Sequence, residues 1–337
     1  MNTDAAHLVT NFTDHELMKN GDSLSPAPSS ASASEPIEFR IDADDPSTFS
    51  TRKLQRICHN YHLHPLLQLS RLEELAKSLM ATKQCRFIKP GTTASSSFDH
   101  DESSPDGRTI SDVFCRIDEK DSWVALYNIQ TDPVYRDFLW GVMKSAGHLV
   151  DHQEKIFGVT GFVFISAPPS VTPFHIDREN NFWMNIRGRK TISLWDREDR
   201  EVVSAPDVEN FIVYRSLDEV KLEDEMRAKS QDFECGPGDG VYFPATTPHM
   251  THSDTSWVQP GNGVAVSIGI DFYTDVTRRN AHVYNVNRLL RKLGANPRPP
   301  HESEWIDRLK FAIGKPILSL QQRRGFSPPP GFSFKDI

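Results

Sequence analysis

The sequence predicts a mainly β protein whose core is a double-stranded β-helix of the cupin or jelly-roll type, flanked by N- and C-terminal helices. From Gly161 onward the chain consists of short runs rich in β-branched and aromatic residues, separated by Gly and Pro: GFVFISAP, NFWMNI, KTISLW, FIVYR, GVYFP and GVAVSIGIDFY. Repeated short strands between such turns are typical of an antiparallel sandwich or barrel. With 337 residues, 37% of them hydrophobic, the chain is long enough to bury one large core with appendages.

The first 36 residues are predicted to form a disordered arm. The stretch from Gly21 to Pro36 reads GDSLSPAPSSASASEP and contains very few large apolar side chains. Burial of these residues would not offset the entropy lost on ordering them.

Residues 37–122 are predicted to form a helical N-terminal region. Apolar residues recur at mainly three- and four-residue intervals between Leu54 and Met80, which predicts two short helices. A polar stretch rich in Ser and Asp at residues 92–107 predicts an exposed loop, either a lid or an inert insertion. The segment after it predicts a helix that leads into a strand at Trp123–Ile129.

The barrel itself is predicted to span residues 123–275, with a helix that begins at Asp132 or Pro133 near its start. A C-terminal helical extension follows at residues 276–337, with a second helix near Trp305 to Ile313. These helices are expected to pack on the barrel or against another subunit, which would make the protein a homodimer.

Composition and charge indicate a cytoplasmic protein. The four cysteines are scattered without a CxxC motif, so we expect free thiols. No stretch approaches the length of a membrane span, and the N-terminus has no basic segment followed by an apolar run. The formal net charge of −8 argues against a dominant nucleic-acid-binding surface, although a local basic groove stays open.

A candidate metal site begins with the HxD pair formed by His175 and Asp177 in VTPFHID. Residues i and i+2 of a strand face the same way, so the two side chains can reach one point. An imidazole nitrogen and a carboxylate oxygen suit ferrous iron when a second histidine completes one face of an octahedron. A tripeptide of this kind also occurs by chance, so the pair needs a third ligand.

The third ligand is expected from PGDGVYFPATTPHMTHSD, which supplies His249 and His252. These positions have opposite parity in an extended strand, so at most one of them faces the barrel interior with the HxD pair. His249 is favoured because it directly follows the turn PATTP and so begins a strand near the mouth.

Lys190 is the candidate residue for binding an anionic cosubstrate. It follows the turn RGR and begins the run KTISLW, and hairpin geometry can return it to the HxD strand. A lysine inside a barrel is costly unless it meets an anion such as a dicarboxylate cosubstrate, whereas a lysine on a strand edge simply faces solvent. Thr172 and Asn181 could donate further hydrogen bonds to the same ligand.

The segments VTPFHID, NF, IRGRK and PGDGVYFPATTPH resemble the jumonji-C-related cupin-like oxygenases, and the likeness runs from about Trp123 to about Tyr273 with motif order and spacing preserved. The resemblance implies three iron ligands, a lysine that pairs with the distal carboxylate of 2-oxoglutarate, and O2 as the other cosubstrate. It assigns these roles to His175, Asp177 and His249 as ligands and to Lys190 as the carboxylate partner, with Thr172, Tyr127 and Asn181 as further cosubstrate-pocket residues.

The sequence departs from this family on the late strand. Where an asparaginyl hydroxylase of the family has an asparagine near the metal, VAVSIGIDF places Ser267 or Gly269, with Asp271 in phase with both. The expected activity is hydroxylation of a protein side chain or a small molecule. Two alternatives stay open: a metal-binding cupin with redox-neutral chemistry, and a non-catalytic barrel that binds a ligand or a partner.

Overall fold

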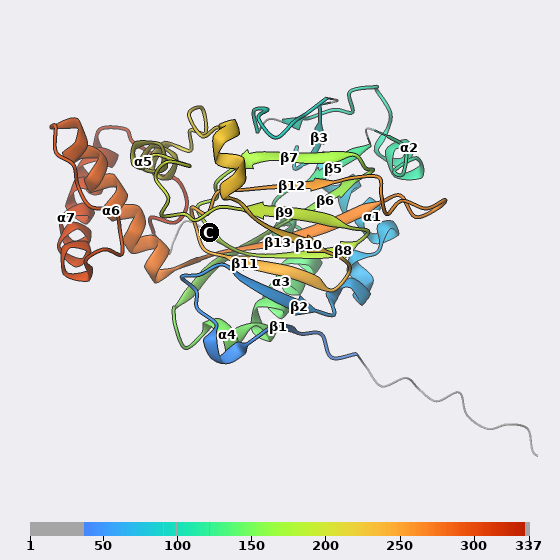
Figure 1. The fold of residues 1–337 in the computed structure, drawn as a ribbon, viewed down its shortest axis with the longest axis horizontal. Coiled ribbons are helices and arrows are strands. Elements are labelled where there is room, and N and C mark those ends of the chain that lie inside the picture. Colours follow the sequence, from blue (N-terminus) through green and yellow to red (C-terminus); the bar gives the residue numbers. More distant parts are fainter. Residues whose placement is uncertain (1–36, 90, 99, 121, 334–337) are drawn as a thin grey trace, which may run out of the picture. The chain divides into compact units, whose positions relative to one another are not determined.

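Two antiparallel sheets pack face to face in the core (Figure 1). The computed structural model describes residues 37–89, 91–98, 100–120 and 122–333, so the predicted N-terminal arm lies outside it. One sheet has nine strands in the order β1-β2-β11-β8-β13-β6-β5-β3-β4, and the other has four in the order β10-β9-β12-β7. The strands are β1 Ile41–Ala43, β2 Gln55–His59, β3 Cys85–Ile88, β4 His100–Asp101, β5 Trp123–Leu126, β6 Ile156–Ser166, β7 Ser170–His175, β8 Asn180–Arg187, β9 Lys190–Leu194, β10 Gln231–Cys235, β11 Asp239–Phe243, β12 His249–Ser253 and β13 Ala265–Thr274.

The eight strands from β6 to β13 form the double-stranded β-helix. Four of them, β11-β8-β13-β6, are neighbours in the large sheet, and the other four make up the small sheet. The chain therefore crosses repeatedly between the two sheets, as a jelly roll requires. The predicted fold class is confirmed.

Strand β8 shows how the sequence separates the barrel interior from the outer core. Phe182, Met184 and Ile186 face outward into the main hydrophobic cluster, whereas the alternate residue Trp183 joins residues of both sheets inside the barrel. Asn181 shares the inward face with Trp183 because strand side chains alternate. The inward face of β8 therefore presents both an apolar residue, Trp183, and a polar one, Asn181, to the barrel interior.

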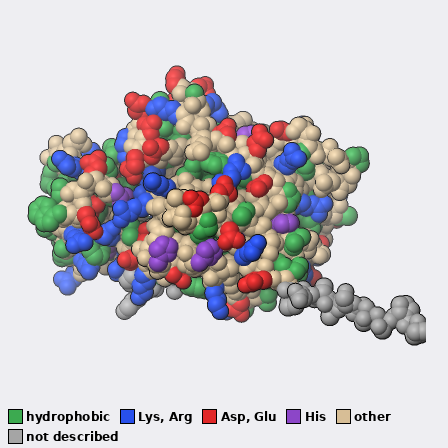
Figure 2. Space-filling model, turned by 60° about the horizontal axis from the view of Figure 1, so that its bottom comes forward, with side chains coloured by type: hydrophobic (Ala, Val, Ile, Leu, Met, Phe, Trp, Pro, Cys, Tyr) green, Lys and Arg blue, Asp and Glu red, His purple; other side chains and the backbone are tan. Residues whose placement is uncertain are grey.

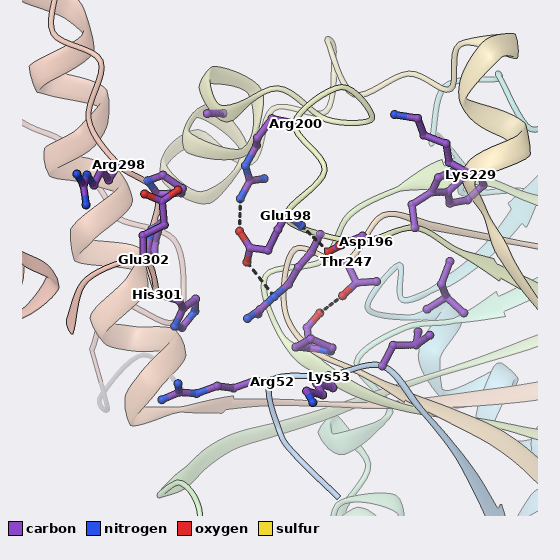
Figure 3. A pocket seen from close by; sticks show the side chains of 18 of the residues that line it. Arg52, Lys53, Asp196, Glu198, Arg200, Lys229, Thr247, Arg298, His301 and Glu302 are labelled. Carbon is purple, nitrogen blue, oxygen red and sulfur yellow. Dashed lines mark hydrogen bonds and ion pairs between the residues drawn. The ribbon is translucent and has the colours of Figure 1, made fainter. Parts of the chain in front are cut away.

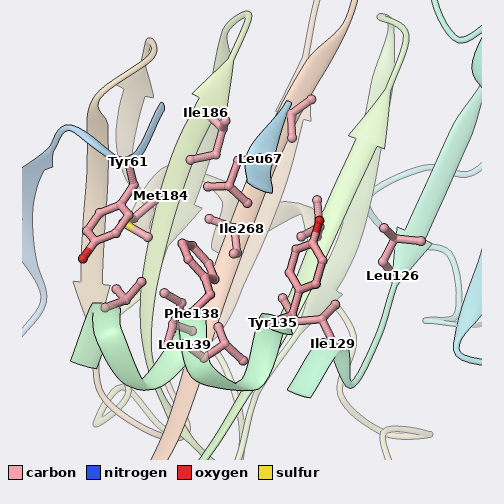
Figure 4. Close-up of a cluster of buried hydrophobic side chains, with 14 of the residues drawn as sticks. Tyr61, Leu67, Leu126, Ile129, Tyr135, Phe138, Leu139, Met184, Ile186 and Ile268 are labelled. Carbon is pink, nitrogen blue, oxygen red and sulfur yellow. The ribbon is translucent and has the colours of Figure 1, made fainter. Parts of the chain in front are cut away.

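Helices cover the outer faces of both sheets. Figure 4 shows α3 lying across the large sheet, with Tyr135, Phe138 and Leu139 directed at strand residues such as Met184 and Ile268. Phe174 and Met250 of the small sheet pack instead against α5, α6 and α7. The helices are α1 Leu69–Met80, α2 Ile110–Cys115, α3 Pro133–Ser145, α4 Gly147–Val150, α5 Ala205–Tyr214, α6 Asp275–Lys292 and α7 Glu304–Arg323. None of the described helices is long and apolar enough to cross a membrane.

The prediction of two short helices between Leu54 and Met80 is wrong in its first half. Residues Gln55–His59 form strand β2, and only α1 is an α-helix in this stretch. Ile57 pairs with Gly240 of β11, so hydrogen bonding to a distant strand overrides the local spacing of apolar residues. The region 37–122 consequently contributes β1 to β4 to the large sheet in addition to its helices.

The run FIVYR, predicted as a strand, is the end of helix α5. Ser204 caps this helix by accepting a hydrogen bond from the Asp207 amide, and a proline occupies the first turn. Phe211 and Ile212 are buried against the outer face of the small sheet. Packing and a strong N-cap here outweigh the β preference of the residues.

Candidate metal centre

His175, Asp177 and His249 meet where strand β7 ends and strand β12 begins. His175 ends β7, His249 begins β12, and the two residues pair directly in the register of the small sheet. One potential ligand atom from each of the three side chains lies within 4.8 Å of the other two. The Nε2 atom of His249 is 3.4 Å from Asp177 Oδ2, and that of His175 is 4.0 Å from Asp177 Oδ1. The geometry brings together the three residues that the sequence predicts as ligands.

Backbone carbonyls orient both imidazoles. The Nδ1 atom of His175 lies 2.7 Å from the carbonyl oxygen of Pro173, and Nδ1 of His249 lies 3.0 Å from that of Thr247. A carbonyl can only accept, so Nδ1 carries the proton in each ring and Nε2 keeps a lone pair. The two Nε2 atoms are the ones that face Asp177, which is the arrangement that a metal ion needs.

Burial keeps the two histidines neutral. It lowers the pKa of His249 to about 4 and that of His175 well below its usual range, and electrostatic coupling between the two imidazoles lowers the pKa of His175 further. Burial, helped by the nearby Glu179, also raises the pKa of Asp177 to about 7, and Arg178 opposes this shift. A divalent cation would reverse the penalty on the carboxylate, because it supplies the missing positive charge.

A β-bulge places Thr172 beside the ligands. Thr172 pairs with Thr251, whereas His175 pairs with His249, so three residue steps on β7 match two on β12. Paired residues share a face of the sheet, and the bulge therefore turns Thr172 and His175 to the same side. Thr172 is buried, as its predicted role requires.

Lys190 points into the barrel and is only 3% exposed. Its ammonium donates a 3.1 Å hydrogen bond to the hydroxyl of Ser267 on the opposite sheet and lies 5.9 Å from the ring centre of Phe164. No ion pair joins it to a carboxylate of any described residue. Burial lowers the pKa of Lys190 to about 7, because nothing nearby compensates its charge.

Asn181 and Asp271 face the same interior and pair with each other in the register of β8 and β13. Asn181 is fully buried, and neither its amide nitrogen nor its amide oxygen has a hydrogen-bond partner among the described residues. Burial, together with Asp177, raises the pKa of Asp271 well above its usual range. Ser267 and Gly269 are on this face too, and Gly269 leaves room for the ring of Phe162, 2.1 Å from where a Cβ would be.

Tyr127 lies just after β5, and its hydroxyl is 2.9 Å from Nδ1 of His100. Its predicted contact with a cosubstrate stays a prediction. His252 pairs with Val171 and Thr191 and alternates with the buried Thr251 and Ser253, so it faces away from the metal ligands. The parity argument that favours His249 agrees with this arrangement.

Phe98 contacts the metal centre, and no sequence pattern predicts this contact. This residue belongs to the polar stretch 92–107, and its ring stacks on that of His175 with the ring centres 4.2 Å apart. The backbone carbonyl of Ala94 in the same stretch accepts a hydrogen bond from the Phe174 amide of β7. The stretch therefore borders the metal centre, which an inert insertion would not do. A lone aromatic residue among serines and aspartates carries no periodic signal that could have revealed this.

No protein-family model and no curated protein matches the sequence. Among solved structures, the chain is similar to the ribosomal oxygenase YcfD of Escherichia coli, with 15% identity and a TM-score of 0.43 over 84% of this chain and 68% of that chain. For YcfD in complex with cobalt and 2-oxoglutarate, the identity is 15% and the TM-score 0.43 over 83% of this chain and 68% of that chain. A cupin superfamily protein from Desulfitobacterium hafniense is 12% identical, with a TM-score of 0.20 over 34% of this chain and 65% of that one. Similarities this weak do not establish an activity for this chain, and the evidence for its function lies in the site itself.

Proposed function

We propose that the protein is an Fe(II)- and 2-oxoglutarate-dependent oxygenase that hydroxylates its substrate. The observation that carries the proposal is a buried lysine without a carboxylate partner in the same barrel as two histidines and one aspartate. A 2-His-1-carboxylate set with open positions is the donor set of non-haem Fe(II) oxygenases. A buried cation is retained at high cost unless it meets an anion.

The donor atoms fit the metal. His175 and His249 each direct a neutral imidazole nitrogen at Asp177, and the carboxylate supplies the negative charge. When bound, Fe(II) and 2-oxoglutarate together reduce dioxygen and supply the oxidant for a C–H bond. The three side chains fix the position of the metal, and Phe98 excludes water from one side of His175.

The interior also fits a dicarboxylate. Lys190 supplies an ammonium for the far carboxylate, and Ser267 holds that ammonium in place. Asn181 offers an unpaired buried donor and acceptor, and Thr172 offers a hydroxyl on the same side as His175. Charge-assisted hydrogen bonds in such a dry interior are stronger than in water.

A cytoplasmic location and a homodimer belong to the same proposal. All four cysteines are free thiols, as expected in a reducing compartment. Trp305 is 72% exposed on α7, and Leu309 and Ile313 follow it at four-residue intervals on the same helix. Figure 2 shows hydrophobic side chains gathered at the end of the molecule where α6 and α7 lie in Figure 1. Pairing of two copies through these helices would cover them.

The experiment that tests the proposal is anaerobic addition of Fe(II) and then 2-oxoglutarate to the full chain. We expect a weak visible charge-transfer band. Asp177→Ala should lose the band with the metal, and His252→Ala should keep it, because His252 faces away from the ligands. If protein that demonstrably contains iron gives no band, the oxygenase assignment fails and a redox-neutral metal-binding cupin replaces it. If the band forms, succinate formation in the presence of candidate substrate pools would identify the substrate.

A further inference from the structure

A large basic pocket lies beside the metal centre but contains none of its ligands. It has a volume of about 1040 Å³, and among the described residues that line it seven are Lys or Arg and three are Asp or Glu. The whole chain has a formal charge of −8, whereas this lining carries more positive than negative side chains. Two of the seven cations are already paired with carboxylates outside the lining, Lys229 with Asp199 and Glu201, and Arg291 with Glu209. Leu194, which pairs with His249, and Thr247 form part of its wall.

The positive side chains come from different parts of the fold and surround the pocket. Arg52 and Lys53 precede β2, Arg200 lies between β9 and α5, and Arg298 lies between α6 and α7. Figure 3 shows these residues, together with Lys229, on different sides of the same space. Such convergence creates a compact region of positive potential and not a linear track.

Several of these cations lack partners. The side chains of Arg52, Lys53 and Arg298 form no ion pair or hydrogen bond with another described residue. Arg200 donates to Glu198 at 3.0 Å, and the same carboxylate is 3.2 Å from Nε of Arg197. The Nε and Nη1 atoms of Arg200 are buried without any acceptor among the described residues. Arg52, Lys53 and Arg298 are exposed, so water solvates them, whereas the buried and unsatisfied nitrogens of Arg200 call for an anion.

The pKa of His301 also reflects the positive charge around the pocket. This histidine lines the pocket, and burial together with the charges of Arg197, Arg52 and Arg279 lowers its pKa to about 3. The ring is therefore neutral at physiological pH and adds no charge of its own. Its Nε2 atom lies 2.9 Å from the Asn280 amide nitrogen, which holds it at the pocket wall.

We propose that this pocket binds a small molecule that carries several phosphate groups. Arginine and lysine together suit phosphate, because the guanidinium pairs with two oxygens and the ammonium acts as a point charge. Sites for single-stranded nucleic acid combine a basic groove with exposed aromatic rings on which bases stack. Trp195 is the only Phe, Tyr or Trp among the described lining residues, and it is buried, so the lining favours a compact polyphosphate over a polymer.

Inorganic tripolyphosphate is the probe for the test, titrated calorimetrically into the full chain after removal of metals with a chelator. Asp177→Ala should bind the probe as tightly as the parent protein, which separates this pocket from the metal centre. The double variant Arg52→Gln/Lys53→Gln should bind it at least about tenfold more weakly, through loss of charge-assisted contacts. Arg298→Gln, from a different wall, should weaken binding in the same direction.

The matched control is Arg136→Gln/Lys144→Gln, which removes the same charge from exposed positions on α3. It should leave the affinity unchanged. Equal losses in the two double variants, or no binding of tripolyphosphate by the parent protein, would overturn the proposal. Tight binding of a short single-stranded RNA in place of tripolyphosphate would also overturn it, in favour of a nucleic-acid partner.

Discussion

Lys190 and Ser267 join the two sheets through a single 3.1 Å hydrogen bond inside the barrel. Lys190 belongs to the small sheet and Ser267 to the large one. A serine hydroxyl can orient an ammonium but cannot neutralise it. The positive charge is therefore available to a ligand that enters the barrel, and the predictions for this residue follow from that.

Replacing Lys190 should separate cosubstrate binding from metal binding. We expect Lys190→Ala to retain the metal but to bind 2-oxoglutarate about thirtyfold more weakly, since a charge-assisted contact in a buried site is worth roughly 2 kcal/mol. Calorimetric titration of 2-oxoglutarate into metal-loaded protein measures the effect. An unchanged affinity would place the anchor elsewhere, and Arg187 or Arg189 in the same hairpin would be tested next.

The affinity for 2-oxoglutarate should depend on pH through Lys190. Burial lowers the pKa of this lysine to about 7, so the ligand-free protein loses the charge as pH rises above that value. A bound carboxylate favours the ammonium form, so binding above pH ~7 requires uptake of a proton and weakens by up to about tenfold per pH unit. Titrations of metal-loaded protein in buffers with different ionisation enthalpies count the proton. An affinity independent of pH between ~6.5 and ~8.5 would contradict the assignment.

Asn181→Leu should stabilise the ligand-free protein and weaken 2-oxoglutarate binding. Neither polar atom of this buried amide has a partner among the described residues, so its replacement by an apolar side chain of similar size removes a desolvation penalty of about 1–3 kcal/mol. Chemical denaturation measures the free energy of unfolding. Asn185→Leu is the control, because the Asn185 amide already donates a 2.9 Å hydrogen bond to the Gly188 carbonyl. Greater stabilisation by Asn185→Leu than by Asn181→Leu would contradict this view.

Gly269→Ala should destabilise the fold. A Cβ at this position would lie 2.1 Å from Cζ of Phe162, and the overpacking should cost about 1–3 kcal/mol or more. Gly141→Ala is the control, since a Cβ there meets no other atom within 4 Å and a helical alanine is favoured over glycine by roughly 0.5–1 kcal/mol. Combining Gly269→Ala with Phe162→Leu should restore stability. Failure of this rescue would mean that the glycine is needed for another reason.

The metal ligands could be predicted from the sequence because the relevant geometry is local. The opposite parity of His249 and His252 follows from strand alternation. Asp177 lies two residues beyond the end of β7, so the turn after the strand, and not strand alternation, brings its carboxylate to His175. Lys190 was open to two interpretations, and only the pairing of β9 with its neighbours shows that it points inward.

Features that depend on contacts between distant segments could not be predicted. Strand β2 forms because β11 lies beside it, and Phe98 reaches His175 from a stretch with no apolar pattern. The positively charged side chains of the basic pocket come from four separate segments, none of which is strongly basic alone. The β-branched and aromatic residues of FIVYR favour a strand, but the Ser-Ala-Pro-Asp sequence before the run is a recognisable helix start, and the helix forms.

The pairing of His175 with His249 determines how much of the chain must be synthesised and folded before the metal site is complete. All of β8 to β11 is translated between these two histidines. A nascent chain that has exposed only the HxD pair holds two of three ligands on an unpaired strand, and such a partial site binds metal weakly. The complete set of three ligands therefore exists only after β12 has paired with β7.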